Sequence, residues 1–111
     1  MKVPNNDNAV IPPEKIVDYL LSKTHPLGKA KALFFEQIGY TLQNTDLFSK
    51  DLHAIIKANS IRSVIETNFG AKYIVKGPIG KRFGKNVVIV TIWIIEEGSS
   101  FPRFITAYPD R

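Results

Sequence analysis

His25 has the setting in this 111-residue sequence that best suits chemistry. It directly precedes Pro26, so it should lie at or beside the N-terminus of a helix, with Lys29 and Lys31 within the next two turns. Cations and a helix N-terminus attract a phosphate, and histidine exchanges a proton near neutral pH. The pattern indicates phosphate chemistry. The alternative, that His25 only caps the helix or packs, stays open.

A second group of polar side chains lies near the C-terminal end. In a predicted strand over residues 103–108, Thr106 and Tyr108 project from one face, whereas Arg103 falls on the other parity at the strand start. Two neighbouring hydroxyls on a basic sheet can hold a phosphate or position a leaving group. Without further observations, an ordinary solvated strand face is the simpler interpretation.

Several other chemistries are disfavoured. The chain has no cysteine, and neither His25 nor His53 has a partner at a zinc-ligand spacing, so we expect no metal and no cofactor. Residues 80–85 end in Gly-Lys, but Asn86 stands where a phosphate loop requires Ser or Thr, and a strand follows instead of a helix. This stretch is therefore predicted to connect two strands, and its positive charges remain able to contact a phosphate.

The positive charge is concentrated in the second half of the chain. The net charge is +5, and no acidic residue occurs between Glu66 and Glu96. That interval contains Lys72, Lys76, Lys81, Arg82 and Lys85. Such a patch suits RNA, because phosphate contacts of Lys and Arg supply most sequence-independent affinity. A solvated hairpin kept soluble by its lysines is the alternative.

The elements that must position these residues follow from the periodicity. Residues 1–10 predict a flexible arm, and residues 11–111 a single domain. Helices are predicted near 12–22, 26–38 and 45–59, and strands near 62–67, 72–76, 86–96 and 103–108. The predicted fold class is α+β, with about three N-terminal helices packed on one face of a four-stranded antiparallel sheet. Without a signal peptide or a membrane span, a soluble cytoplasmic protein is expected.

The strand over residues 86–96 is the most apolar stretch and should lie centrally in the sheet. One parity is wholly aliphatic, with Val88, Val90, Ile92 and Ile94, and is predicted to face the helices. Thr91 and Trp93 fall on the other parity, which is predicted to bind substrate. Packing of Trp93 in the core is the alternative.

Four stretches carry a resemblance to a known family: residues 25–35 (HPxGxxKAxFF), 70–78, 91–93 and 102–109 (PRxxTAYP). Over about residues 11–109 the chain resembles a small bacterial family of uncharacterised domains. Its order of elements is similar to that of the barnase, EndoU, colicin and RelE-like ribonuclease toxins. In contact-dependent toxins of that group, a histidine from the helical part and a Thr-x-Tyr pair form the site, and His25, Thr106 and Tyr108 match these features.

The resemblance implies metal-independent RNA cleavage, in which a 2′-hydroxyl attacks the neighbouring phosphate. His25 would be the general base or acid, and Thr106 and Tyr108 would contact the phosphate or the leaving group. The family site usually includes an arginine, whose role falls here to Lys29, Lys31 or Arg103. Substrate would be bound by Lys72, Lys76, Arg82, Thr91 and Trp93. A cognate antitoxin or immunity protein is the implied partner.

Two other classes of function stay open: a noncatalytic nucleic-acid-binding module, and an antitoxin-like or immunity-like domain that binds an acidic protein. The ribonuclease hypothesis makes a geometric prediction. Thr91 or Trp93 should border the same depression as His25 and Tyr108.

Overall fold

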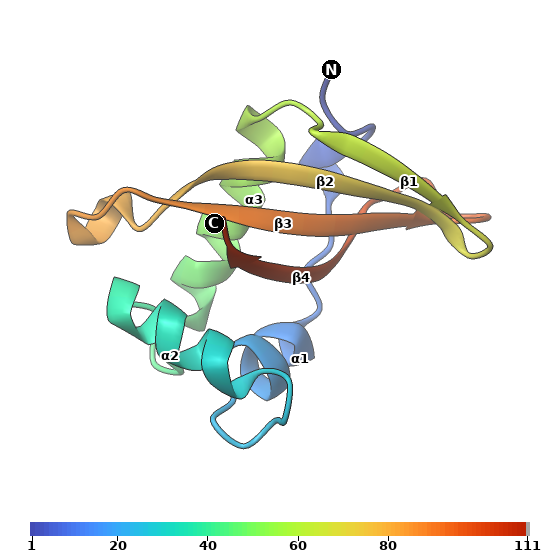
Figure 1. Cartoon of the computed structure of the whole chain (residues 1–111). Helices are drawn as coiled ribbons and strands as arrows, with labels where there is room; N and C mark the ends of the chain where they lie inside the picture. Colours follow the sequence, from blue (N-terminus) through green and yellow to red (C-terminus); the bar gives the residue numbers. More distant parts are fainter. Residues whose placement is uncertain (111) are drawn as a thin grey trace.

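The computed structural model describes residues 1–110, and its strands form one antiparallel meander (Figure 1). Neighbours in space follow the order of the sequence, and each pair is antiparallel. The strands are β1 Ser63–Thr67, β2 Gly70–Ile79, β3 Val87–Glu96 and β4 Arg103–Pro109. The predicted four-stranded antiparallel sheet is confirmed, with the most apolar stretch as a central strand.

Three helical segments precede the sheet, as predicted. They are α1 Pro13–Lys15, which continues directly into the π-helical turn η2 Ile16–Leu20, then α2 Lys29–Ile38 and α3 Thr45–Ala58. Short 3-10 turns form at η1 Asn6–Asn8 and η3 Lys81–Phe83. In Figure 1, α3 crosses behind β2 and β3, while α2 and the α1 segment lie beside the β4 edge. The α+β fold class is therefore confirmed.

The core lies against the opposite face of the sheet from the predicted one. Trp93 and Thr91 are fully buried, and Trp93 packs edge to face on Phe104 with ring centroids 5.1 Å apart. On the other parity, Val88 is 42% exposed, and this face carries no helix. The assignment of the helices to the Val88 parity was wrong, and Thr91 and Trp93 are core residues and not substrate-binding residues.

Mutual hydrogen bonding explains why these two polar side chains face the core. The indole N–H of Trp93 donates to Thr91 Oγ1 at 2.8 Å, and the Thr91 hydroxyl donates to the Val75 carbonyl at 2.7 Å. A buried polar group costs little when it has a partner, while the large indole gains from burial. The polarity of Thr91 and Trp93 predicts a face that binds substrate. In the structure their hydrogen-bonding groups are paired inside the core, so the two side chains do not need solvent.

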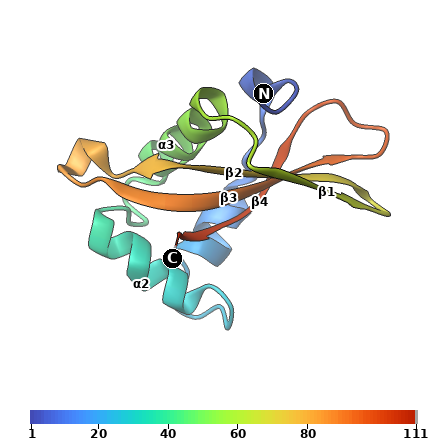
Figure 2. The ribbon, with the colours of Figure 1, turned by 45° about the horizontal axis from the view of Figure 1, so that its top comes forward.

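The first ten residues pack on the domain, which differs from the predicted flexible arm. Val3 is 1% exposed, and the Met1 carbonyl accepts a hydrogen bond from the Ile61 N–H at 2.7 Å. Val10 forms a parallel bridge with Arg103 at the start of β4. Figure 2 shows the N-terminal turn beside the end of α3. The segment therefore covers part of the core and part of the β4 edge.

Within residues 1–110, no helix has the length and apolar character needed to cross a membrane.

Candidate active site

Residues from three separate elements meet at the β4 edge of the sheet. An open depression there is lined by the apolar side chains of Leu27 and Ile105 together with Glu14, Lys15, Asp18, Tyr19, His25 and Thr106. The rings of Tyr19 and His25 meet edge to face, with centroids 5.1 Å apart. His25 and Thr106, which the sequence singled out separately, therefore border one depression.

Lys31 links the helical side of this site to the sheet. Its Nζ donates to Thr106 Oγ1 at 2.8 Å and to Tyr19 Oη at 2.6 Å. The two hydroxyls of Tyr19 and Thr106 are themselves 3.1 Å apart. One ammonium group and two hydroxyls thus form a closed triangle of hydrogen bonds, which we call the Tyr19–Lys31–Thr106 triangle.

The irregular end of β4 positions Thr106. Thr106 pairs with Ile92 and Phe104 pairs with Trp93, so Ile105 is an extra residue and the register shifts there. A β-bulge redirects the side chains next to it. Phe104 is consequently buried in the core, while Thr106 projects on the open side of an edge strand, where the α1 and α2 segments can reach it.

The π-helical turn and Gly28 position Tyr19. In η2 the Leu21 N–H bonds to the Ile16 carbonyl at 2.9 Å, and such π-turns are frequent at functional sites. A Cβ atom on Gly28 would lie 2.0 Å from the Tyr19 carbonyl oxygen. Only glycine therefore allows the loop that carries His25 to pass this close to the turn.

His25 both borders the depression and accepts hydrogen bonds from the turn that leads into α2. Its Nδ1 atom accepts the backbone N–H groups of Leu27 at 3.0 Å and Gly28 at 3.2 Å. An accepting Nδ1 has no hydrogen, so the proton of the neutral ring is on Nε2. In this geometry His25 offers an N–H donor to a ligand. The unprotonated nitrogen, Nδ1, is engaged by these two backbone N–H groups, and the role of His25 as general base or acid stays a prediction.

The Tyr19 phenol has a perturbed acidity. Burial alone would raise its pKa, but the hydrogen bonds with Lys31 and Thr106 and the charges of Lys31 and Lys15 together lower the pKa below the ordinary value. Tyr19 was absent from the sequence-based site. Its neighbour Thr106 is 87 positions away, and in the sequence Tyr19 only flanks the apolar stripe of a short helix, so no local signal identifies it.

Three other predicted catalytic residues do not join the triangle. Lys29 is exposed at the start of α2. It stands two positions before Lys31, so the two side chains point about 200° apart around the helix axis. Arg103 pairs with Glu96, with Nε and Oε1 2.9 Å apart. Tyr108 is half-buried opposite Val90, two residues beyond Thr106 and outside the lining of the depression. Thr91 and Trp93 are buried and do not line it either, so the prediction that one of them shares a depression with His25 and Tyr108 was wrong.

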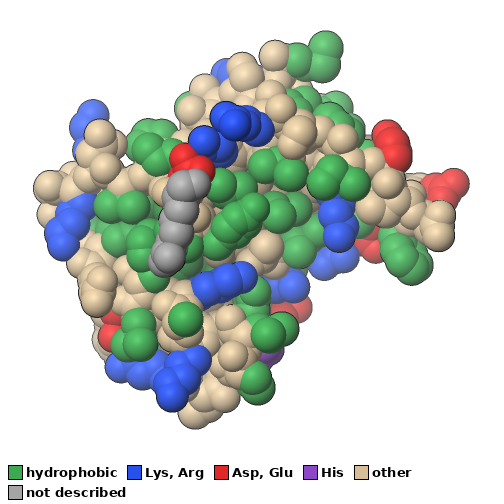
Figure 3. Space-filling model, viewed as in Figure 1, with side chains coloured by type: hydrophobic (Ala, Val, Ile, Leu, Met, Phe, Trp, Pro, Cys, Tyr) green, Lys and Arg blue, Asp and Glu red, His purple; other side chains and the backbone are tan. Residues whose placement is uncertain are grey.

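The predicted substrate-binding cations lie elsewhere. Lys72 lies on the open face opposite Ile94, and Lys76 pairs there with Asp110 at 2.7 Å. Figure 3 shows hydrophobic side chains across the middle of this face, with Lys and Arg side chains around them. This open face continues to the β4 edge and to Thr106, so Lys72 and Lys76 stay candidates for contact with an extended substrate.

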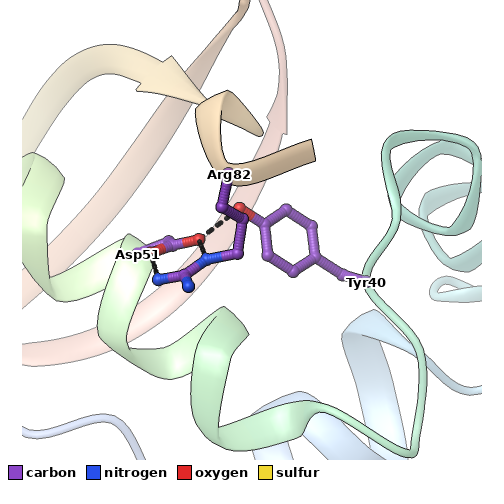
Figure 4. Close-up of polar contacts among 3 residues, drawn as sticks. All are labelled: Tyr40, Asp51 and Arg82. Atoms are coloured by element: carbon purple, nitrogen blue, oxygen red, sulfur yellow. Dashed lines mark hydrogen bonds and ion pairs between the residues drawn. The ribbon is translucent and has the colours of Figure 1, made fainter. Parts of the chain in front are cut away.

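Arg82 lies in η3, outside the lining of the depression, and is held by an ion pair with Asp51 (Figure 4). Its guanidinium makes two bonds to the Asp51 carboxylate, at 2.6 and 2.7 Å, and the Tyr40 hydroxyl donates to the same carboxylate at 2.5 Å. These contacts fasten the loop between β2 and β3 to α3. In this geometry the Arg82 charge is paired with Asp51, so the residue is better explained by packing of the loop than by substrate binding.

Among residues 1–110, no group of three or more His, Asp or Glu side chains is arranged to hold a metal ion.

The arrangement of helices and sheet defines a fold that is known from a toxin–immunity pair. A chain of the solved "Contact-dependent growth inhibition toxin - immunity protein complex from Klebsiella pneumoniae 342" superposes on this chain with a TM-score of 0.71. The alignment covers 91% of this chain and 99% of the other, at 19% sequence identity. At that identity, the likeness shows the fold alone.

The sequence itself belongs to the family described as "Domain of unknown function (DUF6883)", whose model matches residues 2–111. The expectation of an uncharacterised domain family is confirmed at this level, and the ribonuclease class stays a prediction. No curated protein matches the sequence with significance.

Proposed function

We propose that this domain is a toxin that cleaves RNA by metal-independent transphosphorylation, as the barnase and RelE-like analogy implies. The observation that carries the proposal is the convergence of His25 and Thr106, 81 positions apart in the sequence, on one depression beside Lys31. Support also comes from the fold, which is similar to that of a chain from a toxin–immunity complex. An immunity protein is the proposed partner, and the proposed place of action is a cytoplasm that contains RNA.

The proposed roles follow from the donors at the site. The Nε2–H of His25 binds a phosphate oxygen, and the Lys31 ammonium stabilises the charge that develops on the phosphorane. Thr106 contacts the same phosphate through its hydroxyl. Glu14 and Asp18 repel anions, so the phosphate is expected to lie toward Lys31 and Lys15, whose ammonium groups both lie over the Tyr19 ring.

Cleavage of total RNA and tRNA in the presence of EDTA tests the proposal. His25→Ala, Lys31→Met and Thr106→Val should each lower the rate, with Lys31→Met costing roughly 100-fold or more. His53→Ala and Lys50→Met, both on α3, are the matched controls and should keep most of the activity. A wild-type chain that is inert after removal of any bound inhibitory protein would refute the proposed activity.

A second candidate function is noncatalytic binding of a protein, as in an immunity-like domain. The open face of the sheet favours it, since Ile65 is 49% and Val88 42% exposed there. Co-expression separates the two functions. Toxicity of the isolated domain that a neighbouring gene relieves supports the toxin, whereas rescue of cells from another toxin supports the immunity-like function. Salt-sensitive RNA binding without cleavage would indicate a nucleic-acid-binding module.

A further inference from the structure

We propose that Tyr19 is the proton acceptor of this site, with Lys31 as the group that holds its phenolate. The inference rests on the proposed RNA cleavage and adds to it the residue that activates the attacking hydroxyl. Tyr19 borders the depression beside His25, and its Oη is the atom to which both Lys31 and Thr106 are bonded.

The other groups around the triangle are poorer proton acceptors. The Nδ1 atom of His25 is occupied by two backbone N–H groups, and its Nε2 carries the proton. The Lys31 ammonium only donates, and a threonine hydroxyl is a weak base. Glu14 and Asp18 also line the depression, but among the described contacts neither is hydrogen-bonded to the triangle.

The charges around Tyr19 favour its ionised form. Lys31 lies 2.6 Å from the hydroxyl oxygen, and Lys15 Nζ lies 5.6 Å from the ring centroid. His25 from the loop and Glu14 and Asp18 from the α1 segment are the other titratable groups of the depression. Burial would raise the pKa of Tyr19, but the hydrogen bonds with Lys31 and Thr106 and the charges of Lys31 and Lys15 outweigh it and lower the pKa.

The Tyr19 phenolate takes the proton of the ribose 2′-hydroxyl, the 2′-oxygen forms a bond to phosphorus, and the bond from phosphorus to the 5′-oxygen breaks. The leaving 5′-oxygen takes a proton from solvent water. The hydroxide so formed takes the proton from Tyr19, which restores the phenolate. The products are a 2′,3′-cyclic phosphate and a 5′-hydroxyl, and Lys31 stays an ammonium ion throughout.

Absorbance titration of tyrosine ionisation tests the acidity of Tyr19 without any substrate. The difference between the wild type and Tyr19→Phe isolates this residue, with Tyr73→Phe as the matched control. Tyr19 should ionise below the ordinary tyrosine value of about 10, and Lys31→Met should raise its midpoint by about one pH unit or more. A Tyr19 midpoint at or above the ordinary value would overturn the assignment.

The pH dependence of RNA cleavage tests the role itself. We expect Tyr19→Phe to lower the rate roughly 100-fold or more while the fold persists by circular dichroism. Lys31→Met should shift the rising limb of the profile to higher pH, and Lys31→Arg should restore it in part. If Lys31 acted only on the phosphate, the rate would fall at every pH without that shift, which would overturn the pairing.

The variants also separate this assignment from the proposed function. An inert wild type refutes both. An active wild type with an equally active Tyr19→Phe variant refutes the assignment alone. The assignment is also refuted if the pH profile of cleavage keeps its rising limb in Tyr19→Phe but loses it in a Glu14→Gln, Asp18→Asn double variant.

Discussion

Gly28 is the residue on which the geometry of the candidate site depends most directly. A Cβ atom on Gly28 would clash with the Tyr19 carbonyl, and Gly28 also provides one of the two N–H groups that orient His25. Its φ angle is −92°, so the need for glycine here is a matter of space and not of backbone conformation. A side chain at this position would push the π-helical turn and the loop apart.

We therefore predict that Gly28→Ala disturbs the site and the fold together. The free energy of unfolding in urea should fall by about 1–3 kcal/mol, as is typical of overpacking. The lowered pKa of Tyr19 should also rise toward its ordinary value. Gly84→Ala is the control for the Tyr19 titration, because Gly84 has open space around it. Its φ of +73° means that this substitution should cost roughly 1–2 kcal/mol of backbone strain without disturbing Tyr19. An unchanged Tyr19 titration in Gly28→Ala would contradict this account.

At the scale of elements, the loop between β2 and β3 is fastened at one end of the sheet by the Tyr40–Asp51–Arg82 cluster (Figure 4). Phe83 adds an apolar contact, since its ring packs edge to face on Tyr40 with centroids 5.1 Å apart. Lys85 donates to the Gln37 carbonyl near the end of α2 at 2.8 Å. The basic loop is thus tied to both α2 and α3, which explains the charges of Arg82 and Lys85 without a bound phosphate.

This cluster predicts a loss of stability in acid. Burial alone would raise the pKa of Asp51, but the bonds from Arg82 and Tyr40 outweigh it and lower the pKa. A folded-state pKa below the unfolded one gives stability that is present above the ordinary carboxyl value of about 4 and is lost as the pH falls through the folded value. In urea titrations between pH 7 and pH 2, the stability gap between the wild type and Asp51→Asn should narrow with acidification. The stability gap between the wild type and Arg82→Gln should also narrow as the pH falls. A gap that stays constant between pH 7 and pH 2 would contradict the linkage.

At the scale of the molecule, helices cover one face of the sheet, and the other face carries no helix. Figure 3 shows that the uncovered face combines an apolar centre with Lys and Arg side chains around it and some acidic side chains at its margin. The N-terminal segment packs against the rest of the domain. Val3 belongs to the core cluster, and Val10 forms a parallel bridge with Arg103 at the edge of β4. Residues 1–10 therefore belong to the folded unit in the structure.

Val3→Ala tests whether this segment contributes to the stability of the whole domain. Because Val3 is fully buried, its truncation should lower the free energy of unfolding by about 1–3 kcal/mol in one cooperative transition. Val10→Ala, at a side chain that is 49% exposed, should change it by less than about 0.5 kcal/mol. Equal and negligible effects of both substitutions would restore the interpretation of a free arm.

The sequence by itself determined the element types, the central place of β3, the antiparallel order and the excess of positive charge. Periodicity and turn residues carry this information, because they reflect local geometry. It also singled out His25 and Thr106, since the start of a helix, the parity of a strand and the family resemblance are visible in the sequence. Fold class and two of the residues that line the candidate site were accessible in this way.

Only the tertiary structure decided which face of β3 is buried and which residue completes the site. The hydrogen bonds that satisfy Thr91 and Trp93 inside the core depend on Val75, in another strand, so side-chain polarity alone misassigned the face. Tyr19 reaches Thr106 because the π-helical turn η2 lies beside the edge strand β4, where a β-bulge redirects Thr106. Contacts between distant segments leave no local period, and for this physical reason Tyr19 could not be found from the sequence.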